Sequence, residues 1–124
     1  MFYDIVRILK AKRPKAFLLE NVKNLKSYDK GRTFIIISEI LKKLDYITFD
    51  QIIDAKHYVP QHRERIFIAG FNREYFNDSI IFKFPETPKK EMRVRDILVK
   101  NPDPKYTLTD HLWSYLQNYA RKHK

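Results

Sequence analysis

FLLENV, residues Phe17 to Val22, is the stretch that decides how the rest of the chain is interpreted. With Ala16 it opens on an apolar run without alternation, which is typical of a strand covered on both faces, as in a parallel sheet packed between helices. The run ends at Glu20 and Asn21, where the predicted strand emerges at its carboxyl end. Ligands bind at that edge in open α/β sheets. Two interpretations stay open from these residues alone: a polar turn after a strand, or a positioned acid or hydrogen-bonding group at Glu20.

A second motif, YVPQHRER at residues 58–65, leads into an apolar run at residues 66–69. ENV at the end of one predicted strand, followed by Pro-Gln-x-Arg-x-Arg at the entrance to another, resembles the DNA (cytosine-5) methyltransferases, and among them the bacterial Dcm-type methylases. Either motif alone would be a weak signal, but their order, with a helix and a strand between them, makes the resemblance specific. The residues that match are Glu20, Asn21 and Val22 in the first motif and Gln61, Arg63 and Arg65 in the second.

The composition is that of one folded domain without cysteine chemistry. With 124 residues, of which 44% are hydrophobic, the chain is long enough for a core and is not compositionally disordered. It has no Cys, which excludes disulfides, thiolate metal sites and a Cys nucleophile from this sequence. His57 and His62 have no third ligand at a suitable spacing, so we predict no metal site. No signal peptide or bilayer-spanning run is present, so we predict a cytoplasmic protein with no membrane partner.

The net charge of +10, with a pI near 9.8, favours a polyanionic partner, and the resemblance implies that this partner is double-stranded DNA. The alternative is an ordinary Lys-rich surface. A polar loop predicted at residues 21–31 carries several of the charges, with a turn signal at residues 29–31. Lys23 and Lys26 in this loop are the candidates for contacts to the DNA backbone. A solvated loop is the simpler interpretation for either lysine taken alone.

Hydrophobic spacing predicts an α/β arrangement of three main strands with helices. We expect the third strand to be central, because it is apolar throughout. We also expect it to run antiparallel to at least one neighbour, because no crossover helix separates it from the second strand. The predicted helices are residues 1–12 and 32–44, and the predicted strands are residues 16–19, 47–53 and 66–71. The resemblance implies that this sheet is an incomplete, C-terminal part of a Rossmann-like class I methyltransferase sheet.

The pattern is looser in the last third of the chain. We predict a short strand at residues 80–84, a proline-containing linker, a short helix at residues 93–98 and a final helix that Thr109 caps. We therefore divide the chain into two parts. Residues 1–84 would be the second half of a methyltransferase catalytic domain, and residues 85–124 a linker and helices leading toward a target-recognition region.

The resemblance implies a role for each motif residue. In this family a cytosine is flipped out of the duplex, and a Cys thiolate adds to carbon 6 so that carbon 5 can accept a methyl group. Glu20 would protonate or hydrogen-bond the pyrimidine N3. Arg65 would contact the flipped base, which suits arginine because its guanidinium presents several fixed donors. Asn21, which would hold the local turn, and Arg63, which would support the site and the DNA backbone, complete the predicted catalytic set. Val22 and Gln61, which would brace its loop, would have supporting roles.

Several family features have no counterpart in this sequence. The glycine-containing loop that holds S-adenosylmethionine and the Pro-Cys loop with the nucleophile are missing, and no Gly-x-Gly-x-x-Gly or P-loop occurs. We therefore interpret the chain as a fragment or subunit, roughly the middle third of a methyltransferase. We expect S-adenosylmethionine in the complete enzyme, no cofactor bound by this chain alone, and no activity from it alone. The alternative is a non-catalytic DNA-binding or assembly module derived from such an enzyme.

An uncovered strand edge predicts association with another chain. In the family fold, the other neighbour of the ENV strand would belong to the missing part, which leaves the edge beside residues 17–19 unpaired. A flat apolar edge is a template for pairing. We expect a complementary N-terminal methyltransferase half or a second copy of the chain to cover it.

Overall fold

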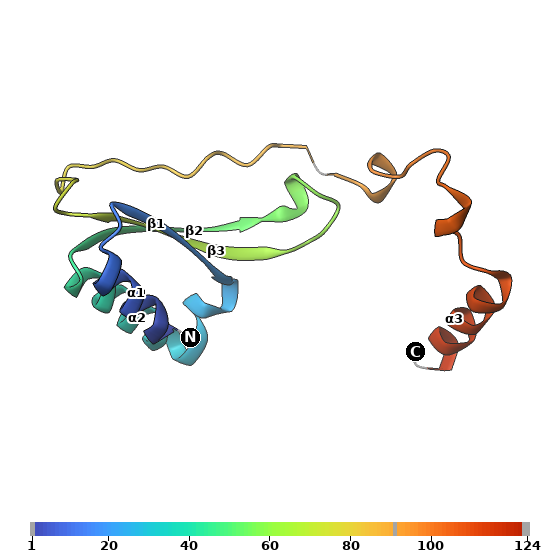
Figure 1. Ribbon diagram of the computed structural model, residues 1–124, viewed down its shortest axis with the longest axis horizontal. Helices are drawn as coiled ribbons and strands as arrows, with labels where there is room; N and C mark the ends of the chain where they lie inside the picture. The colour runs from blue at the N-terminus through green and yellow to red at the C-terminus, as the bar shows by residue number, and fades with distance from the viewer. Residues whose placement is uncertain (1, 91, 123–124) are drawn as a thin grey trace. The chain divides into compact units, whose positions relative to one another are not determined.

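The computed structural model describes residues 2–90 and 92–122, and the chain divides into two compact units, Met1–Arg93 and Val94–Lys124. The first unit holds a sheet with two helices, which is the predicted α/β class (Figure 1). Met1, the first residue of a predicted helix, lies outside the described residues. The elements of this unit are α1 (Phe2–Lys12), β1 (Ala16–Val22), α2 (Arg32–Lys43), β2 (Tyr46–Asp54) and β3 (Glu64–Asn72).

The sheet has the strand order β1-β3-β2, and β3 runs antiparallel to both neighbours. The central place of β3 and its antiparallel direction confirm the prediction. The parallel setting suggested by the apolar run at residues 16–19 is wrong within this chain, because β1 pairs with the antiparallel β3 and exposes alternate residues. The connection from β2 to β3, residues 55–63, contains one 3-10 turn, η3 (Ala55–His57). Such a connection is too short to cross over the sheet and produce a parallel pair.

β1 is longer than predicted and includes the ENV residues. Its pairing with β3 continues to Val22, which lies opposite Arg65. Glu20 and Asn21 are therefore strand residues and not turn residues, and successive strand residues point to opposite faces of a sheet. Asn21 lies on the helix-covered face, opposite the buried Ile66, and Glu20 lies on the other face.

The segment between β1 and α2 is more regular than the predicted loop. It forms two 3-10 turns, η1 (Lys23–Lys26) and η2 (Tyr28–Gly31). The predicted turn at its end is confirmed, because Asp29, Lys30 and Gly31 all have positive φ angles, of 51°, 56° and 84°. Glycine takes this left-handed conformation without strain, so Gly31 is suited to the entry into α2.

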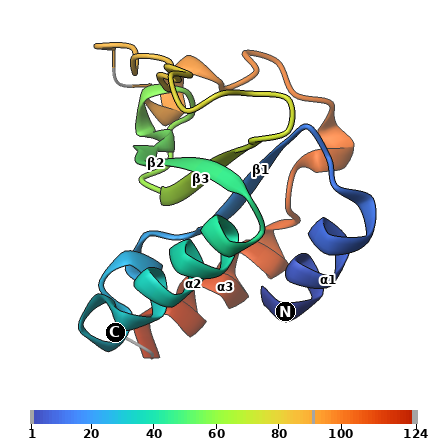
Figure 2. The ribbon, with the colours of Figure 1, turned by 90° about the vertical axis from the view of Figure 1, so that its left-hand side faces the viewer.

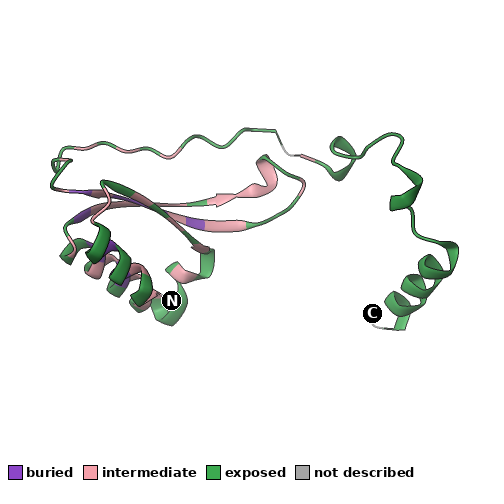
Figure 3. Ribbon diagram, in the orientation of Figure 1, coloured by how far each residue is buried: buried purple, intermediate pink, exposed green. Residues whose placement is uncertain are grey.

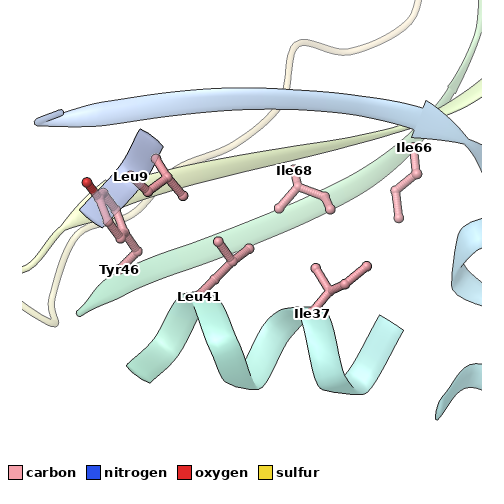
Figure 4. Close-up of a cluster of buried hydrophobic side chains, with 6 residues drawn as sticks. All are labelled: Leu9, Ile37, Leu41, Tyr46, Ile66 and Ile68. Carbon is pink, nitrogen blue, oxygen red and sulfur yellow. The ribbon is translucent and has the colours of Figure 1, made fainter. Parts of the chain in front are cut away.

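The hydrophobic core lies between the sheet and the two helices α1 and α2, which cover one face (Figure 2). Leu41 and Ile66 are fully buried, and side chains from α2 point toward those of β3 (Figure 4). Tyr46 is also buried, and its hydroxyl donates a hydrogen bond of 2.9 Å to the carbonyl oxygen of Pro14, which satisfies its polar end. The buried members of the cluster are Leu9, Ile37, Leu41, Tyr46, Ile66 and Ile68.

The opposite face of the sheet is crossed by the extended segment that follows β3 (Figure 1). The strand predicted at residues 80–84 is wrong, because this segment has no strand pairing. Its Phe82 ring lies instead on the sheet, with centroids 5.7 Å from Phe49 and 5.1 Å from Phe71. Burial alternates along residues 80–84 because side chains pack onto a sheet face, without a backbone ladder.

The second unit contains two 3-10 turns, η4 (Val94–Asp96) and η5 (Pro104–Tyr106), and the helix α3 (Asp110–Lys122). The helix predicted at residues 93–98 is reduced to η4. The predicted cap of the last helix is confirmed, because the Thr109 hydroxyl oxygen accepts the N–H of Leu112 at 3.3 Å. All described residues of this unit are exposed, so it has no core of its own (Figure 3). Among the described residues, no helix is long and apolar enough to cross a membrane.

Candidate catalytic site

The two sequence motifs meet on the open face of the sheet, the face that α1 and α2 leave uncovered. Glu20 lies opposite Phe67 in the β1–β3 register, one pair away from Arg65 on the same face. Glu20 and Arg65 form an ion pair, with Nε of Arg65 2.9 Å from Oε1 of Glu20. The Arg65 side chain is 21% exposed and that of Glu20 is 48% exposed. The pair is therefore held by the sheet while both groups still reach solvent or a ligand.

A cavity of about 350 Å³ surrounds this pair. Carboxylate and guanidinium groups supply its polar atoms, and aromatic and aliphatic side chains supply the rest of its wall. Such a combination can bind a flat, polar ring by stacking and directed hydrogen bonds. A larger hollow of about 440 Å³ between α2 and β2 contains none of the motif residues, so size alone does not identify the site. The residues that line the site cavity are Glu20, Ile53, Ala55, Tyr58, Arg63, Arg65 and Phe67.

Asn21 lies on the opposite face of β1 from Glu20, whereas Val22 shares the face of Glu20. The Asn21 side-chain oxygen accepts the backbone N–H of Val22 at 2.8 Å. Asn21 lines a cavity of about 170 Å³ on the helix-covered side of the sheet, and it does not line the cavity of Arg63 and Arg65. Val22 is about half exposed on the open face, beside Arg65.

Gln61 and Arg63 lie in the connection between β2 and β3. Gln61 is exposed, and its N–H donates to the carbonyl oxygen of Val59 at 2.7 Å. Arg63 lines the site cavity, and its backbone N–H donates to the Asp54 carboxylate at 3.0 Å. Burial raises the pKa of Asp54, but hydrogen bonds from the backbone N–H groups of Lys56 and Arg63 and from His62 outweigh it and hold the pKa below its ordinary value.

The two lysines predicted to contact the DNA backbone are both ion-paired within the chain. Lys23 pairs with Glu64 of β3, and Lys26 pairs with Asp50 of β2 at 2.5 Å. A phosphate would have to compete with these carboxylates, which weakens any contribution of either lysine to DNA binding. Among the described residues, no group of three His, Cys, Asp or Glu side chains is placed to hold a metal ion.

Four residues that line the site cavity, Ile53, Ala55, Tyr58 and Phe67, had no assigned role from the sequence, and neither had Asp54 beside it. Phe67 shares the face of Arg65, and the two-residue period of a strand would have found it. Tyr58 lies within the second motif, but its place in the cavity depends on the path of the loop. Asp54 precedes the backbone N–H of Lys56 by two residues, which is the spacing of a side-chain cap on a turn.

The fold is shared with known methyltransferases. The crystal structure of the S. pombe Dnmt2 methyltransferase aligns with a TM-score of 0.59 at 16% sequence identity, over 94% of this chain and 39% of that one. The Entamoeba histolytica methyltransferase EhMeth aligns with a TM-score of 0.56 at 20% identity, over 90% of this chain and 34% of that one. At such identities the likeness establishes the fold, a part of a Rossmann-like methyltransferase domain.

Sequence comparison then establishes the family. The profile of the C-5 cytosine-specific DNA methylases matches residues 1–124, and the chain belongs to this family. It is 54% identical over 115 residues to the type II methyltransferase M.SsoII of Shigella sonnei, covering 92% of the chain and 30% of that protein. It is 43% identical over 137 aligned residues to the DNA-cytosine methyltransferase of Escherichia coli strain K12, covering all of the chain and 29% of that protein. The chain thus spans about a third of the length of these relatives.

Proposed function

We propose that this chain forms one wall of the catalytic site of a DNA cytosine-5 methyltransferase, which transfers a methyl group from S-adenosylmethionine to carbon 5 of a flipped cytosine. The observation that carries the proposal is the contact between Glu20 and Arg65, which joins the two motifs across the β1–β3 pair at 2.9 Å. The cavity around the pair is open to the surface and offers both an aromatic wall and directed polar groups.

Glu20 and Arg65 can divide the recognition of a cytosine between them. A carboxylic acid at Glu20 donates to N3 of the ring, and the guanidinium of Arg65 donates to O2. Both contacts draw electron density from the ring, which favours attack of a thiolate at carbon 6. The contact between the two side chains holds each in place before the base arrives, which lowers the entropic cost of binding. The thiolate itself must come from outside this sequence, since it has no Cys.

The described residues do not fit an S-adenosylmethionine site. A glycine-containing loop that binds a cofactor needs exposed backbone, and neither Gly31 nor Gly70 supplies it. A Cβ atom added at Gly70 would lie 2.1 Å from the Phe17 ring, so that space is filled by the core, and Gly31 is used in the turn before α2. S-adenosylmethionine supplies the methyl group, and we place its binding in another segment of the enzyme.

DNA and a complementary segment are the proposed partners. The net charge of +10 supports attraction to the phosphate backbone, with affinity that falls steeply as salt rises. In the described residues β1 pairs with β3 along one edge only, and Leu18 is exposed beside the other edge. A segment corresponding to the N-terminal part of the relatives would pair there, and a second copy of this chain is the competing occupant.

Reconstitution tests the proposal. The chain is mixed with the two segments of M.SsoII that flank the matched region in that relative, and methyl transfer to double-stranded DNA is measured with labelled S-adenosylmethionine. We expect transfer from the mixture, none from any component alone, and none from a mixture containing Arg65→Ala. DNA binding by the chain without transfer in any mixture would contradict the proposal and would favour a non-catalytic DNA-binding module.

A further inference from the structure

Asp54, the last residue of β2, forms hydrogen bonds with both ends of the connection that carries the second motif. Its Oδ1 atom accepts the backbone N–H of Lys56 at 3.1 Å and that of Arg63 at 3.0 Å. Its Oδ2 atom lies 2.6 Å from Nδ1 of His62. One carboxylate therefore binds the beginning and the end of the connection, residues 55–63, which leaves β2 and returns to β3 (Figure 1).

We call this set of hydrogen bonds between Asp54 and the two ends of the connection the clasp. Burial of Asp54 and a further backbone hydrogen bond strengthen it. The Asp54 side chain is only 15% exposed, so the three contacts replace water as its hydrogen-bonding partners. The backbone adds a further bond beside it, from the N–H of Ala55 to the carbonyl oxygen of Arg63 at 3.1 Å. Strand pairing then begins at once, because Asp54 lies opposite Glu64 in the register. The groups that face the clasp are Lys23, Lys56, His62, Arg63 and Glu64.

The consequence of the clasp lies in the cavity. Arg63 is hydrogen-bonded to Asp54 through its backbone N–H and lines the site cavity together with Arg65. Ala55 and Tyr58, on the same connection, line the same cavity. Fixing the two ends of the connection therefore fixes one wall of the site, although Asp54 itself does not line the cavity.

We propose that Asp54 is a positioning residue that orients Arg63 and the loop around it for binding of the target DNA. The inference rests on the proposed function for the identity of the ligand and goes beyond it in naming the residue that places this wall. The carboxylate acts through backbone N–H groups, so its acceptor oxygen matters more than its charge.

A second aspartate of the chain provides a matched control. Asp103 accepts the backbone N–H of Lys105 at 3.0 Å, the same two-residue turn contact that Asp54 makes with Lys56. The contacts of the Asp103 side chain with Lys105 lie within this one turn, whereas those of Asp54 join two ends of a loop. Substituting either aspartate removes one negative charge and one local turn contact. Only the substitution at Asp54 also removes the hydrogen bond that joins the two ends of the loop.

The test uses the full 124-residue chain, amide hydrogen exchange and titration with a labelled DNA duplex. We expect Asp54→Ala to speed exchange of the Lys56 and Arg63 amides by about ten- to a hundredfold, the range for a lost bond to a charged acceptor. Removing a negative charge alone would strengthen DNA binding, as we expect for Asp103→Ala. Asp54→Ala should weaken it instead, and by as much as Arg63→Ala.

Two comparisons separate positioning from a general effect on folding. Asp54→Asn keeps an acceptor oxygen for both amides, so we expect it to retain slow exchange and unchanged or stronger DNA binding. Asp54→Ala should add no further loss of DNA affinity in an Arg63→Ala background. The proposal would be overturned if Asp54→Ala and Arg63→Ala reduced DNA affinity by independent factors that multiply in the double variant. Unchanged amide exchange in Asp54→Ala, or no DNA binding by the unsubstituted chain, would overturn it as well. If these results hold while reconstitution yields no methyl transfer, the proposed reaction fails and the role of Asp54 stands.

Discussion

The two faces of the sheet differ: the face covered by helices forms the hydrophobic core, and the open face carries the candidate site. On the helix-covered face, Leu41 and Ile66 are fully buried, and the side chains between helices and strands are almost entirely apolar. On the open face, Glu20 and Arg65 form an ion pair that reaches a cavity. The strand β1 contributes to both faces, since its residues alternate between them. Under the proposed function, a change at one β1 position should affect binding, whereas a change at the next should affect the core.

The open face is itself divided along the strands. At one end Phe82 covers Phe49 and Phe71, and at the other end the cavity lies between Glu20 and Tyr58. The aromatic end is covered by the chain's own segment, which removes apolar surface from water. The cavity end is left for a ligand. Substitutions on the two faces, and at the two ends of the open face, should therefore have different effects on activity and stability.

The largest effect should come from Glu20 on the open face. In the reconstituted enzyme, we expect Glu20→Gln to slow turnover by about 10²- to 10⁴-fold, because it removes a proton donor of the kind used in general acid catalysis. Affinity for DNA and the urea midpoint of unfolding should stay close to those of the unsubstituted chain, since the side chain is about half exposed. Glu39→Gln on the exposed side of α2 is the control, and it should leave turnover unchanged. Undiminished turnover in Glu20→Gln would show that its assigned role is wrong.

A substitution on the helix-covered face should have the opposite pattern. We expect Leu41→Ala to lower the free energy of unfolding by about 2–5 kcal/mol, because it opens a cavity in the core where this side chain is fully buried. Urea unfolding followed by circular dichroism measures the change. Ile36→Ala, an exposed position on the same helix, should cost less than about 0.5 kcal/mol. Equal losses at the two positions would contradict the assignment of the buried face.

Elements with a clear hydrophobic period were predictable from the sequence. The runs at residues 32–44 and 47–53 correspond to α2 and β2 to within one residue at each end. The continuation of β1 through Glu20 and Asn21 was not predictable, because Asn is a poor strand former and pairing with β3 keeps this segment extended. The strand predicted at residues 80–84 fails for a related reason, since tertiary packing of Phe82 holds this segment on the sheet without strand pairing.

The candidate site was predictable in its residues more than in its arrangement. The two motifs named Glu20 and Arg65, which the structure brings into contact. The motifs do not predict that Asn21 faces the helices, because the face on which a strand residue lies depends on strand register and not on spacing in the sequence. Asp54 and Tyr58 depend on the path of the loop from β2 to β3, and a loop path is decided by contacts between residues distant in sequence.

A smaller effect should follow from opening the aromatic end of the open face. We expect Phe82→Ala to lower the free energy of unfolding by about 1 kcal/mol or more, since each aromatic pair contributes about 0.5–1.5 kcal/mol. Trypsin should also cleave after Lys83 faster, because the segment is no longer held to the sheet. Ile81→Ala, at an exposed neighbouring position, should change neither quantity. Slow cleavage retained in Phe82→Ala would show that other contacts hold this segment.

The smallest effect concerns the acid dependence of the loop beside the cavity. Burial opposes ionisation of Asp54, but its hydrogen bonds prevail and lower its pKa below the ordinary value of 3.8. The native state therefore binds this proton less readily than the unfolded chain does. The stabilisation by ionised Asp54 is fully present above the unfolded pKa and is lost as the pH falls through the lower, folded pKa. Urea midpoints of the unsubstituted chain and Asp54→Asn, measured from about pH 6 to about pH 2, should thus differ most at the upper end and converge in acid. A difference that stayed constant, or grew as the pH fell, would mean that the carboxylate of Asp54 is not held ionised by the loop.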